Sequence, residues 1–263
     1  MPSISALAMW VEQLQSRGRY TFTGAEAESD TERSFVGVQT ALRRLKEQGR
    51  VVSPRRGFYV VVPPEYRAAG APPASWFIDD LMHYIGQPYY VGVLSAAALH
   101  GAGHQQPMVF QVVTDRPTRD VRVGKVTIRF TMSGLVDRLP AVELQTETGT
   151  MRVATPETCA FDLVRFPAAA GHLSNAATVL AELAERLDAQ LLVDIAPLVR
   201  IPDVQRLGYL LDAVGQDEIA APLVAWLSSR KPRAVPLQPG VGTDSGPDPR
   251  WYVVPNVELE VDV

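Results

Sequence analysis

The most constraining feature of the chain is a cationic segment between Arg33 and Arg56. Seven Arg or Lys side chains lie there against one acid, Glu47, although the 263-residue chain has a formal charge of −4. The string TALRRLKEQGRVVSPRRGFYVV predicts an amphipathic helix that ends at a glycine, a short strand, a tight turn at Pro54 to Gly57 and a second strand. This order is typical of a winged helix-turn-helix, in which a helix enters a DNA groove and a hairpin touches the neighbouring backbone.

The residues before this segment complete such a domain. Apolar residues recur at helical spacing over residues 4–17, and a short strand is expected next. Thr23 and Glu26 fit a capping box that begins a second helix, and the third helix is expected to end before Gly49. We therefore predict a winged helix-turn-helix DNA-binding domain over residues 1–66.

A projection of the third helix separates an apolar face from a polar one. Val38, Ala41, Leu42 and Leu45 share the face that is expected to pack. A run of positive charge is most often only a solvated helix face, but here it continues into the turn, which favours DNA binding. The predicted DNA-binding residues are Arg33, Val36, Gly37, Gln39, Thr40, Arg43, Arg44, Arg50, Arg55 and Arg56.

These residues are expected to differ in role. Val36 and Thr40 lie in the half of the helix that approaches base edges, and Gly37 permits close approach of the duplex. Arg43 and Arg44 reach guanine or phosphate. The remaining arginines, Arg50, Arg55 and Arg56, are predicted phosphate contacts, the last two at an exposed hairpin tip.

The rest of the chain predicts a larger mixed α/β domain over residues 67–263, so that the fold class is α+β. The Ala-, Pro- and Gly-rich stretch 67–74 is typical of a linker or crossing segment. Helices are expected at 76–85 and 93–99, and strands at 109–113, 121–123 and 126–131 predict an antiparallel sheet. Further helices follow Pro156, so a division near residue 155 into a sheet-rich and a helical part is possible. The closing strands are expected at 251–254 and 257–261.

Composition argues against an enzyme. The single cysteine, Cys159, excludes an intrachain disulfide and a zinc site made of cysteines. His100 and His104 are separated by glycines that break the helix needed to align them as ligands. We expect no catalytic residue, metal or cofactor. No apolar run reaches the roughly 18 residues of a membrane helix and no signal sequence is recognisable, so a cytoplasmic location is expected.

Three stretches together resemble a known family. They are ALRRLKEQGRVVSPRRGFYVV, YYVGVLSAAALHGAGHQQPMVFQVVT and TPETCAFDLVRF, and the resemblance covers most of residues 3–200. The chain resembles the AbiEi-type antitoxins, also described as transcriptional regulators, of bacterial toxin-antitoxin systems. The most specific part is Leu94 to Gly101 together with Thr155-Pro156-Glu157.

The resemblance implies a two-part protein. The N-terminal domain of that family binds inverted repeats in the promoter of its own operon and represses it, whereas the C-terminal domain neutralises a nucleotidyltransferase-like toxin. By position, Thr40, Arg43, Arg44, Arg55 and Arg56 match the recognition helix and the wing. The expected partners are therefore double-stranded DNA and a cognate toxin, with or without a stable complex.

Two alternatives stay open at this point. The C-terminal part could bind a small molecule, which would make the chain a ligand-sensing regulator. The second alternative is a DNA-cleaving enzyme with a winged targeting domain, using Asp115, Asp120 and Lys125 near a metal, although their spacing fits no nuclease motif. The operator, the toxin and the oligomeric state on DNA do not follow from the sequence.

Overall fold

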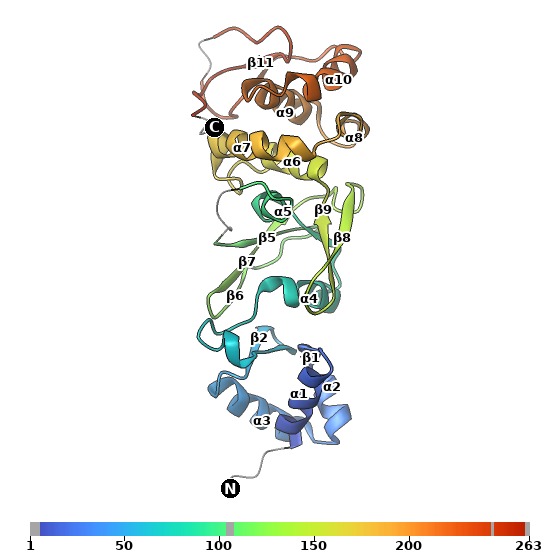
Figure 1. Ribbon diagram of the computed structural model, residues 1–263, viewed down its shortest axis with the longest axis vertical. Helices are drawn as coiled ribbons and strands as arrows, with labels where there is room; N and C mark the ends of the chain where they lie inside the picture. Colours follow the sequence, from blue (N-terminus) through green and yellow to red (C-terminus); the bar gives the residue numbers. More distant parts are fainter. Residues whose placement is uncertain (1–5, 104–107, 243–244, 261–263) are drawn as a thin grey trace.

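The computed structural model describes residues 6–103, 108–242 and 245–260. The molecule is elongated, and its elements follow one another along the long axis nearly in chain order (Figure 1). The N-terminal helices form one end, a sheet lies in the middle, and a stack of helices with the closing strands forms the other end. The fold is therefore a mixed α/β arrangement.

Three helices and a small sheet form the N-terminal end. The elements are α1 (Ala6–Ser16), β1 (Thr21–Thr23), α2 (Gly24–Thr31), α3 (Phe35–Glu47), β2 (Val51–Arg55) and β3 (Phe58–Val61). The strands form an antiparallel sheet in the order β1-β3-β2. This is the element order that the sequence predicted.

Local sequence explains where the second and third helices begin. The Thr23 side chain accepts a hydrogen bond from the Glu26 backbone, and the Glu26 carboxylate accepts one from the Thr23 backbone, so the capping box is confirmed. Ser34 caps α3 by accepting from the Gly37 backbone at 3.3 Å. The predicted packing face of α3 is also confirmed, since its buried residues are Val38, Ala41, Leu42 and Leu45.

The hairpin strand β3 belongs to two hydrophobic cores at once. Tyr59 and Val61 pack into the cluster formed by α1, α2 and α3, whereas Phe58 and Val60 pack into the large cluster of the rest of the molecule. This alternation follows from the two-residue period of a strand, which points successive side chains to opposite faces. The N-terminal end is thus joined to its neighbour by shared packing as well as by the chain.

The stretch predicted as a linker packs against the sheet. Two short 3-10 helices bound it, η1 (Pro64–Tyr66) and η2 (Ala74–Trp76), and Ala71 between them is buried. A Cβ added at Gly70 would lie 2.8 Å from the Cα of Gly124, so the two glycines allow the backbones to touch. The Lys125 backbone N–H donates to the Ala69 carbonyl at 2.7 Å. The segment is a crossing segment held in place.

The middle layer is a six-stranded sheet with two helices. Its elements are α4 (Ile78–Ile85), β4 (Tyr89–Val91), α5 (Val93–Leu99), β5 (Phe110–Thr114), β6 (Val121–Val123), β7 (Val126–Met132), β8 (Ala141–Gln145) and β9 (Thr150–Ala154). The strand order is β6-β7-β5-β4-β9-β8. The prediction of an antiparallel sheet was wrong, because β5 pairs with β7, and β4 with β9, in parallel. Strand β6, which lies between β5 and β7 in the chain, runs antiparallel to β7 and so allows β5 and β7 to run parallel. The sequence did not predict strands β4, β8 and β9.

Helices form the remaining layers. They are α6 (Pro156–Arg165), α7 (His172–Leu183), the short η3 (Ala184–Arg186), α8 (Ala189–Ile195), α9 (Ile201–Ala213) and α10 (Asp217–Ser228), followed by the parallel pair β10 (Val235–Pro236) and β11 (Val253–Val254). The predicted closing strand at 251–254 is confined to two residues, and residues 257–260 form no strand. Gly208 lets Trp251 lie on α9, since a Cβ there would meet its ring at 2.1 Å.

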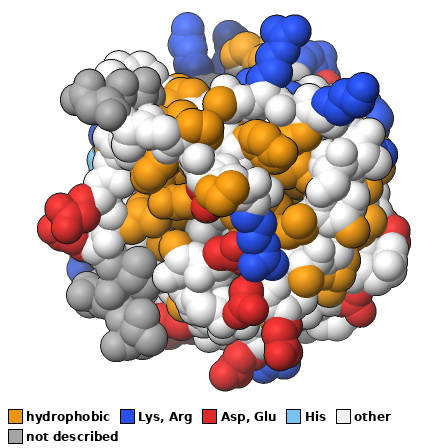
Figure 2. Space-filling model, turned by 90° about the horizontal axis from the view of Figure 1, so that it is seen from above, with side chains coloured by type: hydrophobic (Ala, Val, Ile, Leu, Met, Phe, Trp, Pro, Cys, Tyr) orange, Lys and Arg blue, Asp and Glu red, His pale blue; other side chains and the backbone are white. Residues whose placement is uncertain are grey.

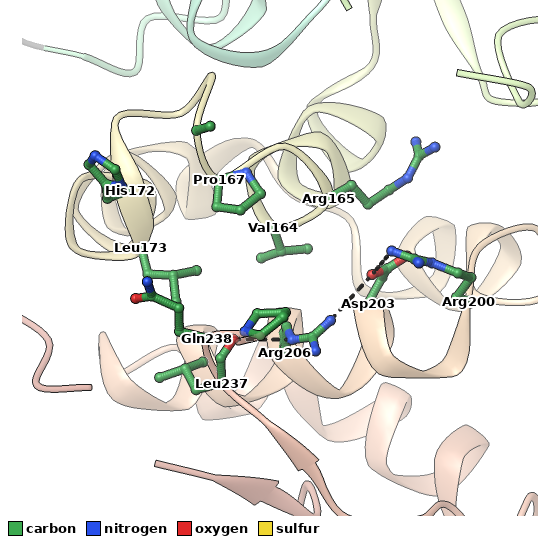
Figure 3. Close-up of a pocket in the computed structure, with 12 residues that line it drawn as sticks. Val164, Arg165, Pro167, His172, Leu173, Arg200, Asp203, Arg206, Leu237 and Gln238 are labelled. Carbon is green, nitrogen blue, oxygen red and sulfur yellow. Dashed lines mark hydrogen bonds and ion pairs between the residues drawn. The ribbon is translucent and has the colours of Figure 1, made fainter. Parts of the chain in front are cut away.

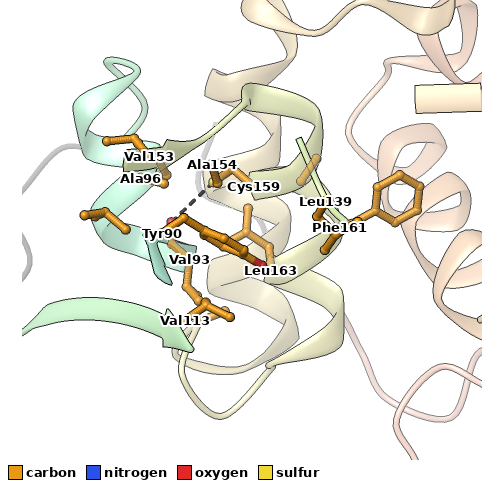
Figure 4. Packing of buried hydrophobic residues seen from close by; sticks show 14 of the residues in the cluster. Tyr90, Val93, Ala96, Val113, Leu139, Val153, Ala154, Cys159, Phe161 and Leu163 are labelled. Carbon is orange, nitrogen blue, oxygen red and sulfur yellow. Dashed lines mark hydrogen bonds between the residues drawn. The ribbon is translucent and has the colours of Figure 1, made fainter. Parts of the chain in front are cut away.

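Helix α6 joins the sheet to the helical end. Cys159, Phe161 and Leu163 are fully buried. Figure 4 shows Cys159 and Leu163 beside side chains of the sheet and of α5, whereas the Phe161 ring points to the other side of α6, toward the helical end. The Cys159 thiol donates to the Val93 carbonyl at 3.3 Å. Burial, reinforced by the nearby Asp162, raises the pKa of this thiol, so Cys159 is a buried cysteine that contributes to packing.

One buried acid links this helix to the sheet. Asp162 is fully buried, and its carboxylate accepts from Arg165 at 3.0 Å and from the Tyr90 hydroxyl at 3.3 Å. Arg165 also donates to the Ser133 hydroxyl at 2.8 Å, which ties the chain after β7 to α6.

Within the described part of the chain, no helix combines the length and the apolar character that crossing a membrane requires.

Candidate nucleic-acid interface

The outward face of α3 carries four of the predicted DNA-binding residues. Val36 is 72% exposed, and the side chains of Thr40, Arg43 and Arg44 are exposed as well. Arg33 is exposed just before the helix begins. Helix α3 lies at the N-terminal end of the elongated molecule, far from the helical layers of the other end (Figure 1).

The positive charges on α3 are weakly paired. Arg43 Nε lies 3.6 Å from Glu47 Oε1, and both side chains are mostly exposed. Such surface pairs contribute little free energy, so a phosphate can replace the carboxylate. Arg44 has no ion pair or hydrogen bond through its side chain to any described residue. These two guanidinium groups are therefore available to an external anion.

The start of α3 is apolar on its outer side. Phe35 is 60% exposed beside Val36, and the sequence interpretation had not included Phe35. The Thr40 hydroxyl donates to the Val36 carbonyl at 2.9 Å, which turns its proton toward the helix. Apolar side chains of this kind suit the methyl group of thymine in the major groove.

Gly37 and Gln39 take different positions on the helix. A Cβ added at Gly37 would meet only the Ser34 hydroxyl oxygen, at 3.4 Å, so neither packing nor backbone conformation requires glycine there. Gln39 is half-buried, and its Nε2 lies 3.9 Å from the point where a Cβ on Gly24 would stand. Gln39 therefore lies along α2, at the margin of the exposed face.

The hairpin tip agrees with the sequence prediction only in part. Arg55 is half-buried, and its guanidinium donates to the Arg119 carbonyl. Burial and the neighbouring Arg119 lower the pKa of Arg55. The prediction that Arg55 stands exposed was wrong because β2 packs beside β6, a contact between segments far apart in the sequence.

The turn itself is fixed by a tyrosine that sequence reasoning missed. The Tyr84 hydroxyl on α4 donates to the Arg56 carbonyl at 2.9 Å. Gly57 has φ of +84°, and a Cβ there would stand 2.5 Å from the Tyr84 oxygen, so glycine is required for both reasons. The Arg56 side chain remains exposed and has no partner among the described residues.

Arg50 is also engaged within the protein. Its guanidinium lies 2.9 Å from Glu12 on α1, and the Arg50 side chain is 24% exposed. The structure therefore gathers Val36, Thr40, Arg43 and Arg44 on one face. Arg50 and Arg55 lie apart from this face and are bonded within the protein. Arg56 also lies apart from it, but its side chain has no partner among the described residues.

The opposite end of the molecule presents a different surface. Viewed from the end that carries α10, hydrophobic side chains cover the centre, with Lys and Arg gathered along one edge and Asp and Glu mainly along the opposite one (Figure 2).

The two acids of the nuclease alternative are paired with arginines. Asp115 lies 3.2 Å from Arg116, and Asp120 lies 3.7 Å from Arg129. Over the ranges that the structure describes, no three His, Cys, Asp or Glu side chains form a group that could hold a metal ion. His104 lies outside those ranges.

Comparison with known proteins relates the middle of the chain to a known family. Residues 90–213 match the model of the AbiEi antitoxin C-terminal domain. No curated protein matches the chain significantly. The crystal structure of the RV2827C protein from Mycobacterium tuberculosis is similar, with a TM-score of 0.67 and 19% identity over 96% of this chain and 92% of that chain, a likeness of fold alone. The family that the sequence motifs indicated is thus confirmed over residues 90–213, the segment from β4 to α9, which matches the C-terminal domain of the AbiEi antitoxins.

Proposed function

We propose that the N-terminal end is a winged helix-turn-helix that binds double-stranded DNA with α3 in the major groove. The observation that carries this proposal is the outward face of α3, where Arg43 and Arg44 stand beside Val36 and Thr40 with only the exposed Glu47 as a paired acid. The opposite face of the helix is buried, so the charged face is presented in a fixed direction. This combination is the one that groove-reading helices use.

The side chains divide by role. Val36 and Thr40, in the N-terminal half of α3, read base edges, and the absence of a side chain at Gly37 lets the duplex approach. Arg33, Arg43 and Arg44 supply phosphate or guanine contacts, and Gln39 acts at the margin. The hairpin is the wing, with Arg56 as its free cation. Arg50 and Arg55 contribute less, since each is already bonded within the protein.

The biological role follows from the family. Membership among AbiEi antitoxins supports a toxin-antitoxin role and implies a toxin partner, and this family is not a class of enzymes. We assign residues 1–66 to DNA binding and residues 67–263 to toxin neutralisation. The chain represses its own operon through inverted repeats and antagonises a nucleotidyltransferase-like toxin.

A mobility-shift assay on the DNA upstream of the chain's own gene tests DNA binding. The full chain is titrated at several salt concentrations with nonspecific competitor present. We expect a specific complex whose affinity falls steeply with salt, as phosphate contacts require. Arg186→Ala, an exposed arginine at the other end of the molecule, is the matched control and should bind normally. Equal binding to upstream and competitor DNA would refute an operator role.

Toxin neutralisation is tested separately by co-expression with the toxin encoded beside the gene. The full chain is used because Phe58 and Val60 of the hairpin contribute to the large core, so removal of residues 1–66 would expose apolar surface. We expect the Arg43→Ala/Arg44→Ala variant to lose repression and to keep neutralisation. Loss of both activities in a folded variant would contradict the division of roles.

A further inference from the structure

A cavity of about 330 Å³ lies in the helical end of the molecule. It is bounded by α6, the start of α7, α9 and the segment that follows β10 (Figure 3). Val164, Leu173 and Leu237 give it apolar walls. A concave, mainly apolar space with a few polar groups is the usual form of a small-molecule site.

Arg206 is one of the polar residues that line this space. The residue is 8% exposed, and its Nε donates to the carbonyls of Pro236 and Leu237, each at 3.1 Å. Its two terminal nitrogens form no hydrogen bond with any described residue, and the closer contact is Nη1 to Asp203 Oδ1 at 3.7 Å. A fully enclosed polar atom with no hydrogen-bond partner would be cut off from solvent, and neither terminal nitrogen of Arg206 is such an atom. Solvent therefore reaches both nitrogens. Because the residue is otherwise buried, that access comes from the cavity it lines.

The carboxylate nearest to Arg206 is already bound to another arginine. Asp203 is 1% exposed, and Arg200 binds it in a bidentate pair with two N–O distances of 3.0 Å. Arg165, which also lines the cavity, is paired with Asp162 at 3.0 Å. Two arginines, Arg200 and Arg206, therefore share one carboxylate. A buried charge that is incompletely paired favours an anion from solution.

We infer that the cavity binds a small organic anion. A carboxylate or phosphate group accepts hydrogen bonds from the terminal nitrogens of Arg206, whose planar guanidinium suits two parallel contacts with one oxyanion. The apolar body of the ligand packs on Val164, Leu173 and Leu237. Such a ligand bridges α6 and α7, within the AbiEi segment, to Leu237, which lies beyond it. The inference is independent of DNA binding.

Calorimetric titration of the full chain with four probes tests the site. Benzoate and phenyl phosphate carry the two oxyanions on an apolar ring, benzamide is the uncharged counterpart of benzoate, and inorganic phosphate lacks the apolar body. We expect one-site binding of benzoate or phenyl phosphate, at least tenfold tighter than benzamide and inorganic phosphate. The tighter of the two organic anions identifies the headgroup. Binding of neither, or equal binding of benzamide or inorganic phosphate, would overturn the assignment.

Variants locate the binding. Arg206→Met should lower the affinity for the organic anion at least tenfold. Because Arg206 also holds two backbone carbonyls, Val164→Phe provides a second route: it fills the cavity, leaves the guanidinium in place, and should abolish binding. Arg186→Met, exposed and outside the cavity, should bind as the unmodified chain does. Unchanged affinity in folded Val164→Phe protein would place the ligand elsewhere and refute the proposal.

Discussion

Arg43 on α3 and Arg165 on α6 each lie beside one carboxylate, yet their surroundings differ. Arg43 is 3.6 Å from Glu47, and its side chain is 75% exposed, whereas Arg165 is 3.0 Å from Asp162, and its side chain is 9% exposed. Water and salt screen the first pair, so its charge can be exchanged for that of a ligand. The second pair lies in the core, so its members depend on each other. Whether an arginine can bind an external anion therefore depends on how deeply its ion pair is buried.

The largest effect should come from breaking the buried pair. Arg165→Met leaves the Asp162 carboxylate in the core without its cation, and we expect unfolding to become easier by about 3–5 kcal/mol at pH 8. Arg43→Met is the matched control and should cost less than about 1 kcal/mol. Urea denaturation measures both. Similar losses in the two variants would erase the distinction between these arginines.

The same variant predicts a pH dependence. Burial raises the pKa of Asp162 to about 7, while Arg165 acts in the opposite direction. An acid with a raised pKa stabilises the fold most at pH values below its unfolded pKa, about 3.9, and this contribution is lost as pH rises toward 7. Removal of Arg165 raises the pKa of Asp162 further. The stability difference between Arg165→Met and the unmodified chain should therefore be smaller at pH 5 than at pH 8, and a constant difference would contradict this assignment.

The exposed arginines should affect DNA binding and leave stability unchanged. For the Arg43→Ala/Arg44→Ala variant, we expect a binding loss of about 1–3 kcal/mol and a salt slope smaller in magnitude by about 2, one for each phosphate contact. The free energy of unfolding should change by less than about 0.5 kcal/mol per substitution. Filter binding across salt and urea denaturation test the two halves of this prediction. If this variant lost stability and bound DNA normally, Arg43 and Arg44 would be structural residues and not DNA contacts.

Gly37→Ala separates helix stability from DNA approach. The added methyl group meets only Ser34, so α3 should gain about 0.5–1 kcal/mol from the replaced glycine. If the duplex lies against this point, affinity should nevertheless fall. A more stable variant that binds DNA as well as the unmodified chain would move the groove contact away from Gly37.

The smallest difference is expected within the hairpin. Arg56→Ala should reduce the salt slope by about 1, whereas Arg55→Ala should change it by less than half as much, because Arg55 is bonded to the Arg119 carbonyl. Salt titrations of the two single variants make this comparison directly. If the double variant leaves the slope unaltered, the hairpin is not a wing.

The predictable parts of the fold were those governed by local pattern. The strong amphipathicity of α3 identified Val38 and Leu42 as buried and Arg44 as exposed, and the capping box fixed the start of α2. Strand β4 has three buried residues and no alternation, and β8 is an edge strand with exposed side chains, so neither carries a clear periodic signal. Parallel pairing depends on strand order, which no local pattern encodes.

The candidate sites show the same limit. The exposed face of α3 follows from one helix, and it was predicted. The contact of Tyr84 with the hairpin turn joins residues 28 positions apart, and the environment of Arg206 depends on a carbonyl 31 positions away. From spacing alone, Arg200, Asp203 and Arg206 would be interpreted as ordinary helix-surface pairs. Only the packing of α6 and the segment after β10 over them makes Arg206 a buried cation.

The bonded hairpin turn has a geometric consequence. Since Tyr84 and Arg119 anchor the turn to the neighbouring layer, and β3 contributes to both cores, the first three helices are not a loosely tethered module. A duplex seated on α3 would set the direction in which the whole long axis projects from the operator. If two copies bind inverted half-sites, the half-site spacing would fix their relative orientation, so that a change of a few base pairs would rotate one molecule relative to the other about the DNA axis.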